Sequence, residues 1–229
     1  MVRRTKAEAE QTRHALLDAA ERLFLERGVS RTTLQDIATA AGTTRGAIYW
    51  HFQDKAALFN AMMDRVTLPL EQAFLDFPDC AQANADGVLA HLLNAILNAL
   101  KATAHDPQTG RVFEIAIHKV EYVSDMRPVV QRRMEAMGQF RQYIQDALER
   151  VAELSNTPLP MSAPDAAMGL CMLFDGLLEN WLLDRSAFDL EAMGRTTLTN
   201  FLRGLGLVLP RETPAAQPGA RSGARGAGV

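Results

Sequence analysis

The sequence predicts an all-α fold with nine helices in two domains. Apolar residues recur at helical spacing along most of the 229 residues. No stretch has the alternating or turn-bounded β-branched pattern of strands. The breaks between periodic segments predict a small domain over residues 1–60 and a larger one over 61–210. They also predict a disordered tail over 211–229, which is mostly Gly, Pro, Ala and Arg and has nothing to bury.

The first four helices have recognisable start and stop signals. Gly28 ends the first and Gly42 ends the second, because glycine readily adopts the left-handed conformation that follows a helix. Thr33 and Asp36 resemble a capping box with Asp in place of the usual Glu, and Thr44 caps the third helix. These signals place helices at about 8–27, 33–41, 45–51 and 54–77.

Five further helices are expected in the larger domain. Polar or proline-containing breaks separate them, such as Asp106-Pro107 and residues 156–160. The expected spans are 85–103, 108–120, 125–154, 163–184 and 189–207.

Several functional classes are disfavoured by composition. No window holds eighteen consecutive apolar residues and the N-terminus is basic and polar, so we expect a cytoplasmic protein without a membrane span or signal peptide. Cys80 and Cys171 lack disulfide-framework or metal-ligand spacing, and the five histidines show no metal spacing either. Without a phosphate-binding loop or nucleophile motif, we expect no enzyme, no metal and no cofactor.

The charge is divided unevenly between the two domains. Residues 1–60 hold nine Lys/Arg against seven Asp/Glu, whereas the rest of the chain holds fifteen against twenty. Arg3, Arg4 and Lys6 form a basic arm before the first helix that could reach phosphates or a minor groove. The alternative for these three residues is an ordinary solvated terminus.

The second helix, the turn at Gly42 and the short third helix form a predicted helix-turn-helix, in which the second of the two helices enters the major groove of DNA. Ile48 and Phe52 are four residues apart and should face inward. Arg45 and Tyr49, also four apart, must then point outward. Double-stranded operator DNA is therefore the expected partner.

The side chains of this region suit contacts with DNA. Arg45 can bond both acceptors of a guanine edge, and Gly46 lets the helix backbone approach closely. The remaining candidates offer hydroxyl, aromatic or cationic groups to bases and phosphates: Thr33, Thr43, Thr44, Tyr49, Trp50, His51 and Lys55. The alternative for the three aromatic side chains is a place in the core, but three consecutive residues of a helix cannot all face one core.

These residues resemble the DNA-binding signature of the TetR family. The resemblance covers about residues 8–60, and its most specific stretches are Thr32 to Ala38, Ala41 to Phe52 and Asp54 to Phe59. Residues 1–6 and 44–52 are most similar to the AcrR/TtgR branch, whose members repress multidrug efflux pump operons. The resemblance implies a nine-helix, Ω-shaped homodimer that binds a palindromic operator and is released by a hydrophobic small molecule bound among helices four to eight.

Candidate ligand residues lie in the larger domain. Asp175 and Glu114 are carboxylates within apolar segments, which is costly unless a ligand or a basic side chain pairs with them. Phe174-Asp175-Gly176-Leu177 resembles a pocket segment of the AcrR/TtgR branch, and Cys171 lies one turn earlier. By the same similarity the wall is formed by Phe113, Ile117, Met137, Phe140 and Ile144. Related members have polar residues at positions 113 and 117, which implies a different set of ligands.

The last two helices are strongly apolar and predict either a dimer seam or an intramolecular core. We favour a four-helix seam between two protomers, because a helix-turn-helix protein needs two reading helices about one DNA turn apart. The apolar residues are Leu170, Phe174, Leu177, Trp181, Leu182, Leu190, Met193, Leu198, Phe201, Leu202 and Leu205. An alternative to the drug-released repressor is a related regulator that answers to a metabolite or a protein partner.

Overall fold

The structure is a computed structural model that describes residues 6–75, 84–121 and 124–209. Within these ranges it contains nine α-helices and no strand, which confirms the predicted all-α fold. The helices are α1 (Lys6–Arg27), α2 (Leu34–Ala40), α3 (Arg45–His51), α4 (Lys55–Leu75), α5 (Ala85–His105), α6 (Pro107–Glu114), α7 (Arg127–Ser155), α8 (Ala163–Leu183) and α9 (Leu190–Gly204). A π-helical turn, η1 (Ile115–Lys119), continues α6, and a 3₁₀ turn, η2 (Ser124–Met126), precedes α7. Arg3, Arg4 and the tail over 211–229 lie outside the described residues.

The predicted helix signals operate as expected. Gly28 and Gly42 adopt φ values of 83° and 66°, in the left-handed region that favours glycine. At the start of α2, the Thr33 backbone N–H donates to the Asp36 carboxylate at 2.9 Å, and the Asp36 N–H donates to the Thr33 hydroxyl at 3.1 Å. The Thr44 hydroxyl accepts from the Ala47 N–H at 3.2 Å and begins α3. Short-range sequence features therefore fix the helix-turn-helix.

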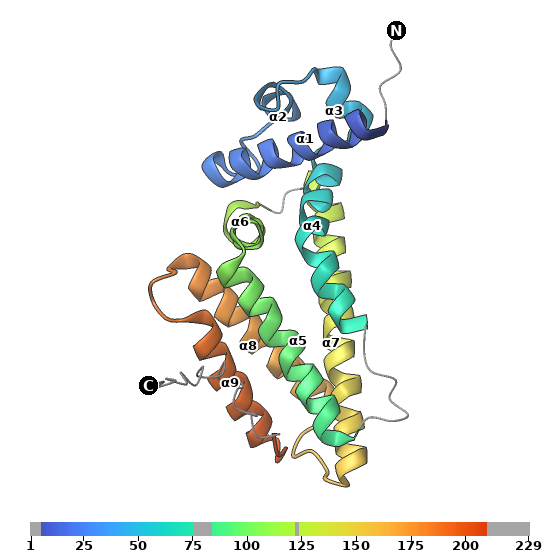
Figure 1. Cartoon of the computed structure of the whole chain (residues 1–229), viewed down its shortest axis with the longest axis vertical. Helices are drawn as coiled ribbons and strands as arrows, with labels where there is room; N and C mark the ends of the chain where they lie inside the picture. The colour runs from blue at the N-terminus through green and yellow to red at the C-terminus, as the bar shows by residue number, and fades with distance from the viewer. Residues whose placement is uncertain (1–5, 76–83, 122–123, 210–229) are drawn as a thin grey trace, which may run out of the picture.

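The helices form a head and a body. Figure 1 shows α1, α2 and α3 grouped at one end of the molecule, with α4 leading away from them beside the long helix α7. Helices α5, α8 and α9 complete the body, and α6 lies at its upper end, beneath α1. Helix α4 belongs to both parts, because it begins directly after α3 and then packs against α7.

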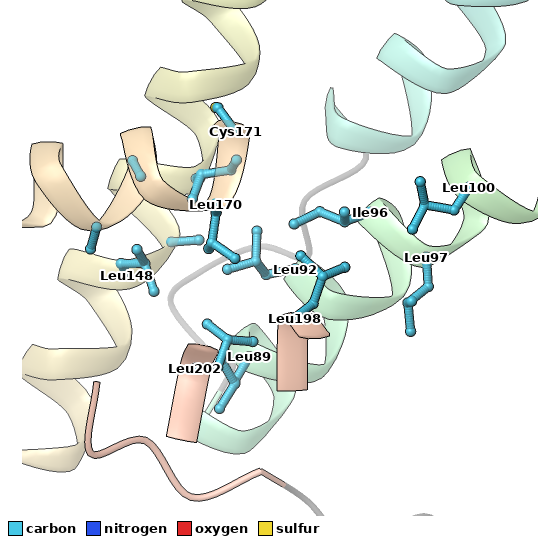
Figure 2. Close-up of a cluster of buried hydrophobic side chains, with 14 of the residues drawn as sticks. Leu89, Leu92, Ile96, Leu97, Leu100, Leu148, Leu170, Cys171, Leu198 and Leu202 are labelled. Carbon is cyan, nitrogen blue, oxygen red and sulfur yellow. The ribbon is translucent and has the colours of Figure 1, made fainter. Parts of the chain in front are cut away.

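The body is built around one apolar cluster. Side chains from α5, α7, α8 and α9 interlock there, as Figure 2 shows for Leu92, Leu148, Leu170 and Leu198. All four are fully buried. Helix α8 is long and apolar enough to cross a membrane by length and composition alone. Its packing against α7 and α9 in this cluster identifies it as a core helix of the body.

The apolar faces of α8 and α9 pack mainly within the protomer. Eight of the eleven side chains predicted to form a dimer seam are buried in the body core: Leu170, Leu177, Trp181, Leu182, Leu190, Leu198, Leu202 and Leu205. Phe174 and Phe201 pack partly against the same cluster. For these side chains the structure bears out the alternative of an intramolecular core, while a contact between two protomers along α8 and α9 stays a prediction. Of the eleven side chains, only Met193 remains largely exposed, at 44%.

The head has a second apolar cluster, and it extends beyond residue 60. Leu16, Phe24, Ile37 and Ile48 form its centre. Met62 and Val66 of α4, Val112 of α6, Ile115 and Ala116 of η1, and Met126 and Val129 next to and within α7 complete it. The core of the head is consequently shared with helices that also wall the body.

Candidate functional site

Helix α3 presents one apolar face and one open face. Ile48 and Phe52 are 0% and 4% exposed, which confirms that they face inward. Arg45 and Tyr49 lie on the other side, and the Arg45 guanidinium carbon is 5.7 Å from the centre of the Tyr49 ring. This cation–π contact holds the two groups side by side without occupying the N–H donors of Arg45.

Trp50 and Gly46 also belong to the exposed part of α3. Trp50 is 73% exposed, so the alternative of a core tryptophan is excluded, and its ring meets His51 edge to face at 4.6 Å between ring centres. A side chain added at Gly46 would meet only the Thr44 hydroxyl, at an ordinary 3.9 Å. The protein itself therefore leaves room for a side chain at this position.

The other predicted DNA-contact residues differ in their exposure. Lys6, Thr33 and Thr44 are exposed, whereas Thr43 and His51 are half-buried. The hydroxyls of Thr33 and Thr44 also cap their helices. The hydrogen bonds from Thr33 lower the pKa of the Asp36 carboxyl below its usual value, so this cap stays ionised at neutral pH.

Lys55 has a different role from the predicted phosphate contact. Its ammonium group donates to three backbone carbonyls, those of Val29 at 2.8 Å, Thr32 at 3.2 Å and Ser30 at 3.4 Å. An ammonium has three donors, so none remains for a phosphate. Burial lowers the pKa of Lys55 below its usual value. The side chain ties α4 to the loop between α1 and α2.

The body contains a largely apolar cavity of about 290 Å³. Residues of α4, α5, α6, η1, α7 and α8 line it. Six of the nine predicted ligand residues meet there: Phe113, Ile117, Met137, Phe140, Phe174 and Asp175. The rings of Phe140 and Phe174 lie 5.4 Å apart, a separation typical of a favourable aromatic pair.

Three predicted ligand residues lie elsewhere. Glu114 forms an ion pair with Arg185 at 3.0 Å, the alternative left open by the sequence. Ile144 and Cys171 are 0% and 4% exposed and belong to the body core, where Figure 2 shows Cys171 on α8. The structure therefore places none of these three side chains in the cavity lining, because Arg185 pairs with Glu114 and neighbouring helices cover Ile144 and Cys171.

The polar lining of the cavity is sparse and nearly balanced in charge. Burial raises the pKa of the Asp175 carboxyl, and the opposite charge of Arg133 limits this rise. Arg132 of α7 bridges to α4 through Asp64 at 2.8 Å and Glu71 at 3.2 Å. The contact with Asp64 raises the pKa of Arg132 further, so this guanidinium stays charged.

The resemblance included the fourth helix in the pocket, but sequence reasoning named none of the α4 residues that line the cavity. Phe59, Asn60, Met63, Thr67 and Glu71 all line it. Their spacing of three or four residues was a visible signal of a common helix face. That signal could not distinguish a wall from an ordinary packing surface.

The head exposes a recognition helix in a helix-turn-helix, and it shares several helices with a helical body that contains a cavity. This arrangement defines a DNA-binding transcriptional regulator. The chain belongs to the TetR family of bacterial regulatory proteins, whose N-terminal signature matches residues 16–62. Residues 88–207 match the C-terminal region of MAATS-type transcriptional repressors.

Known proteins resemble the chain over most of its length. The HTH-type transcriptional regulator TtgR of Pseudomonas putida is 39% identical over 190 residues, which cover 83% of this chain and 89% of TtgR. The crystal structure of NalD, the secondary repressor of the MexAB-OprM multidrug efflux pump in Pseudomonas aeruginosa, has a TM-score of 0.77 at 34% identity and covers 87% of this chain and 98% of NalD. The complex of SmeT with triclosan has a TM-score of 0.75 at 27% identity and covers 91% and 100% of the two chains. SmeT is the repressor of the SmeDEF multidrug efflux pump of Stenotrophomonas maltophilia.

The substitution Lys55→Met tests the structural role of this lysine. We expect the free energy of unfolding to fall by roughly 1–3 kcal/mol, because three carbonyls lose a charged donor. We also expect the slope of log K against log[salt] for DNA binding to stay unchanged. Urea unfolding and binding titrations at several salt concentrations measure the two effects.

Lys101→Met, at an exposed position on α5, is the stability control. Lys6→Met is the control for a predicted phosphate contact, and it should reduce the salt slope by about 0.9. A similar reduction of the salt slope in Lys55→Met would show that Lys55 does contact a DNA phosphate, as the sequence predicted.

Proposed function

We propose that this protein is a cytoplasmic, homodimeric repressor, without catalytic activity, that controls a multidrug efflux pump operon and leaves its operator when a hydrophobic small molecule binds. The open face of α3 would read the operator through Arg45, Gly46 and Tyr49. The names of NalD and SmeT, both repressors of multidrug efflux pumps, support the efflux assignment.

The observation that carries the proposal is the position of α4. This helix starts at Lys55, only four residues after α3 ends at His51, and its side chains then wall the cavity. A ligand that wedges between α4 and α7 would shift the helix that holds the head. A coupling free energy of about 1–3 kcal/mol between ligand and DNA is sufficient for release.

Dimerisation is part of the proposal because an operator with two half-sites needs two reading helices. Met168, Met172 and Leu183 lie on one stripe of α8, and Met193 lies on α9. Their exposed fractions are 37%, 66%, 75% and 44%. We propose this exposed stripe, in place of the buried seam predicted from the sequence, as the contact with a second copy.

The cavity wall favours apolar, aromatic ligands. Phe113 and Ile117 add an aromatic ring and a branched alkyl group to the lining that also contains the Phe140–Phe174 pair. Asp175 is the acceptor for a hydroxyl, amine or cationic group of the ligand. The charges of Arg132, Arg133, Glu71 and Asp175 balance, so burial of apolar surface is the main driving force.

The direct test is fluorescence anisotropy of labelled DNA at fixed salt. The DNA is the region upstream of the protein's own gene, and the panel includes triclosan, other hydrophobic drugs and plant phenolics. We expect tight binding that members of the panel weaken about 5- to 150-fold.

Tight binding that no compound weakens would contradict release by drugs and favour a regulator that answers to a metabolite or a protein partner. Failure to bind specific DNA, including sites selected from a random library, would contradict the repressor itself.

Gly46→Ala should separate stability from DNA binding. Alanine is a better helix former by up to about 1 kcal/mol, and the added methyl group meets no close protein atom. We therefore expect an unchanged or higher melting temperature but about tenfold weaker operator binding, because the methyl group holds α3 away from the base edges. Gly138→Ala on α7 is the control, because a methyl group added there also meets no close protein atom, and it should leave operator binding unchanged. Equal operator affinity for Gly46→Ala and the parent protein would refute close backbone approach.

The substitution Asp175→Asn should weaken the binding of a cationic ligand more than that of a neutral ligand. We expect tetraphenylphosphonium, a hydrophobic cation, to bind at least about tenfold more weakly, since one half-buried ion pair is worth a few kcal/mol at an effective dielectric constant near 20. Neutral triclosan should bind within threefold of the parent. In the parent protein, the affinity for the cation should fall as the pH is lowered through the raised pKa of Asp175, because protonation removes the negative charge.

Isothermal titration calorimetry without DNA measures these affinities. Asp146→Asn on the exposed side of α7 is the matched control. Equal losses for the two ligands would place Asp175 in a structural role.

A further inference from the structure

A buried carboxylate lies where the head meets the body. Glu21 of α1 is 3% exposed, and among the described residues it is the one charged side chain in the buried class. One of its oxygens accepts from Gln108 of α6 at 2.8 Å and from Arg65 of α4 at 3.1 Å. The other oxygen lies 3.7 Å from the guanidinium of Arg111 of α6. Three helices therefore meet at this one carboxylate.

Helix α6 connects this carboxylate to the cavity. Gln108 and Arg111 are three residues apart and project from the same side of the helix. Phe113, two residues after Arg111, projects about 200° further round and lines the cavity. The adjoining turn η1 supplies Ala116 and Ile117 to the cavity wall. A ligand that shifts the backbone at Phe113 would therefore also move the helix whose Gln108 and Arg111 contact Glu21.

A second contact joins the same two parts. The backbone N–H of Val29, in the loop after α1, donates to the carbonyl of Lys119 at the end of η1 at 3.0 Å. The stretch from α6 to η1 is thus bound to the head near both ends. Its π-helical turn is a geometry that is frequent at functional sites.

We propose that Glu21 is the positioning residue through which an occupied cavity moves the DNA-binding head. A buried carboxylate is stable only while its partners remain in place, because an unpaired buried charge is strongly unfavourable. A shift of α6 therefore either draws α1 with it or breaks the cluster. Burial raises the pKa of Glu21 while Gln108, Arg65 and Arg111 oppose that rise, which agrees with a carboxylate that depends on its neighbours. This inference rests on the proposed release by ligand.

The test removes the partners on α6 and leaves Glu21 itself intact. Gln108→Ala and the double variant Gln108→Ala/Arg111→Met keep the Arg65 contact, and both altered side chains are only half-buried, so the variants should fold. The matched control is Gln142→Ala on the surface of α7, where the amide donates to Asp146 at the same 2.8 Å. Full-length proteins are compared for DNA binding alone, triclosan binding alone, and the factor by which saturating triclosan weakens DNA binding.

We expect the two separate affinities to remain within threefold of the parent protein, while the release factor falls to less than a third in Gln108→Ala and further in the double variant. Gln142→Ala should match the parent. An unchanged release factor in the double variant would overturn the proposal, as would a loss of triclosan affinity large enough to explain the weaker release.

Hydrogen exchange keeps the inference testable if triclosan fails to release the parent protein, an outcome that would count against the proposed function with this ligand. Without any ligand, the double variant should exchange the backbone amides of α1 at least threefold faster than the parent, with α8 unchanged. Equal exchange rates for α1 in the double variant and the parent protein would show that the contacts of Glu21 with α6 do not stabilise the head. This result alone would overturn the inference.

Discussion

The shared apolar core of the head is the constraint on which the rest of the structure depends. Helices α2 and α3 have seven residues each, well below the roughly 12–15 residues at which an isolated helix becomes even marginally stable. They persist because they pack against α1 and against each other, with Ile37 and Ile48 buried in an apolar cluster that α4, α6 and η1 complete by packing against α1. Because the head is stabilised by apolar side chains of α4, α6 and η1, it cannot keep its position when these elements move.

This shared core links the exposed face of α3 to the cavity through few intervening residues. Helix α4 offers Met62 and Val66 to the head cluster and Phe59 to both the cluster and the cavity wall. Ala116 of η1 likewise belongs to both. One layer of side chains therefore separates the core of the head from the ligand space. Since packed interiors transmit displacement more than they absorb it, small shifts at the cavity should reach α3.

The fold was predictable from sequence because its information is local. Gly28, Gly42 and the Thr33–Asp36 capping box act over one helical turn, and each is visible as a short pattern. The outward direction of Arg45 and Tyr49 followed from Ile48 and Phe52 by helix geometry alone. The cavity was predictable only in part. Phe140 and Ile144 lie one turn apart on the same face of α7, yet one lines the cavity and the other is packed in the core.

Sequence alone also does not distinguish structural from ligand-binding charged residues, because the cost of burying a charge depends on its partners in the fold. Glu114 and Asp175 both interrupt apolar segments, and the sequence assigns both the same penalty for burial. The outcome depends on tertiary partners. Arg185 approaches Glu114 to 3.0 Å, whereas Asp175 stays within the cavity lining, under the longer-range influence of Arg133 and Glu179. Lys55 differs from its predicted role for a similar reason, because its three acceptors lie in a loop more than twenty residues earlier. A carboxylate or an ammonium is thus committed to structure or left for a ligand by tertiary contacts, and only the folded chain decides which.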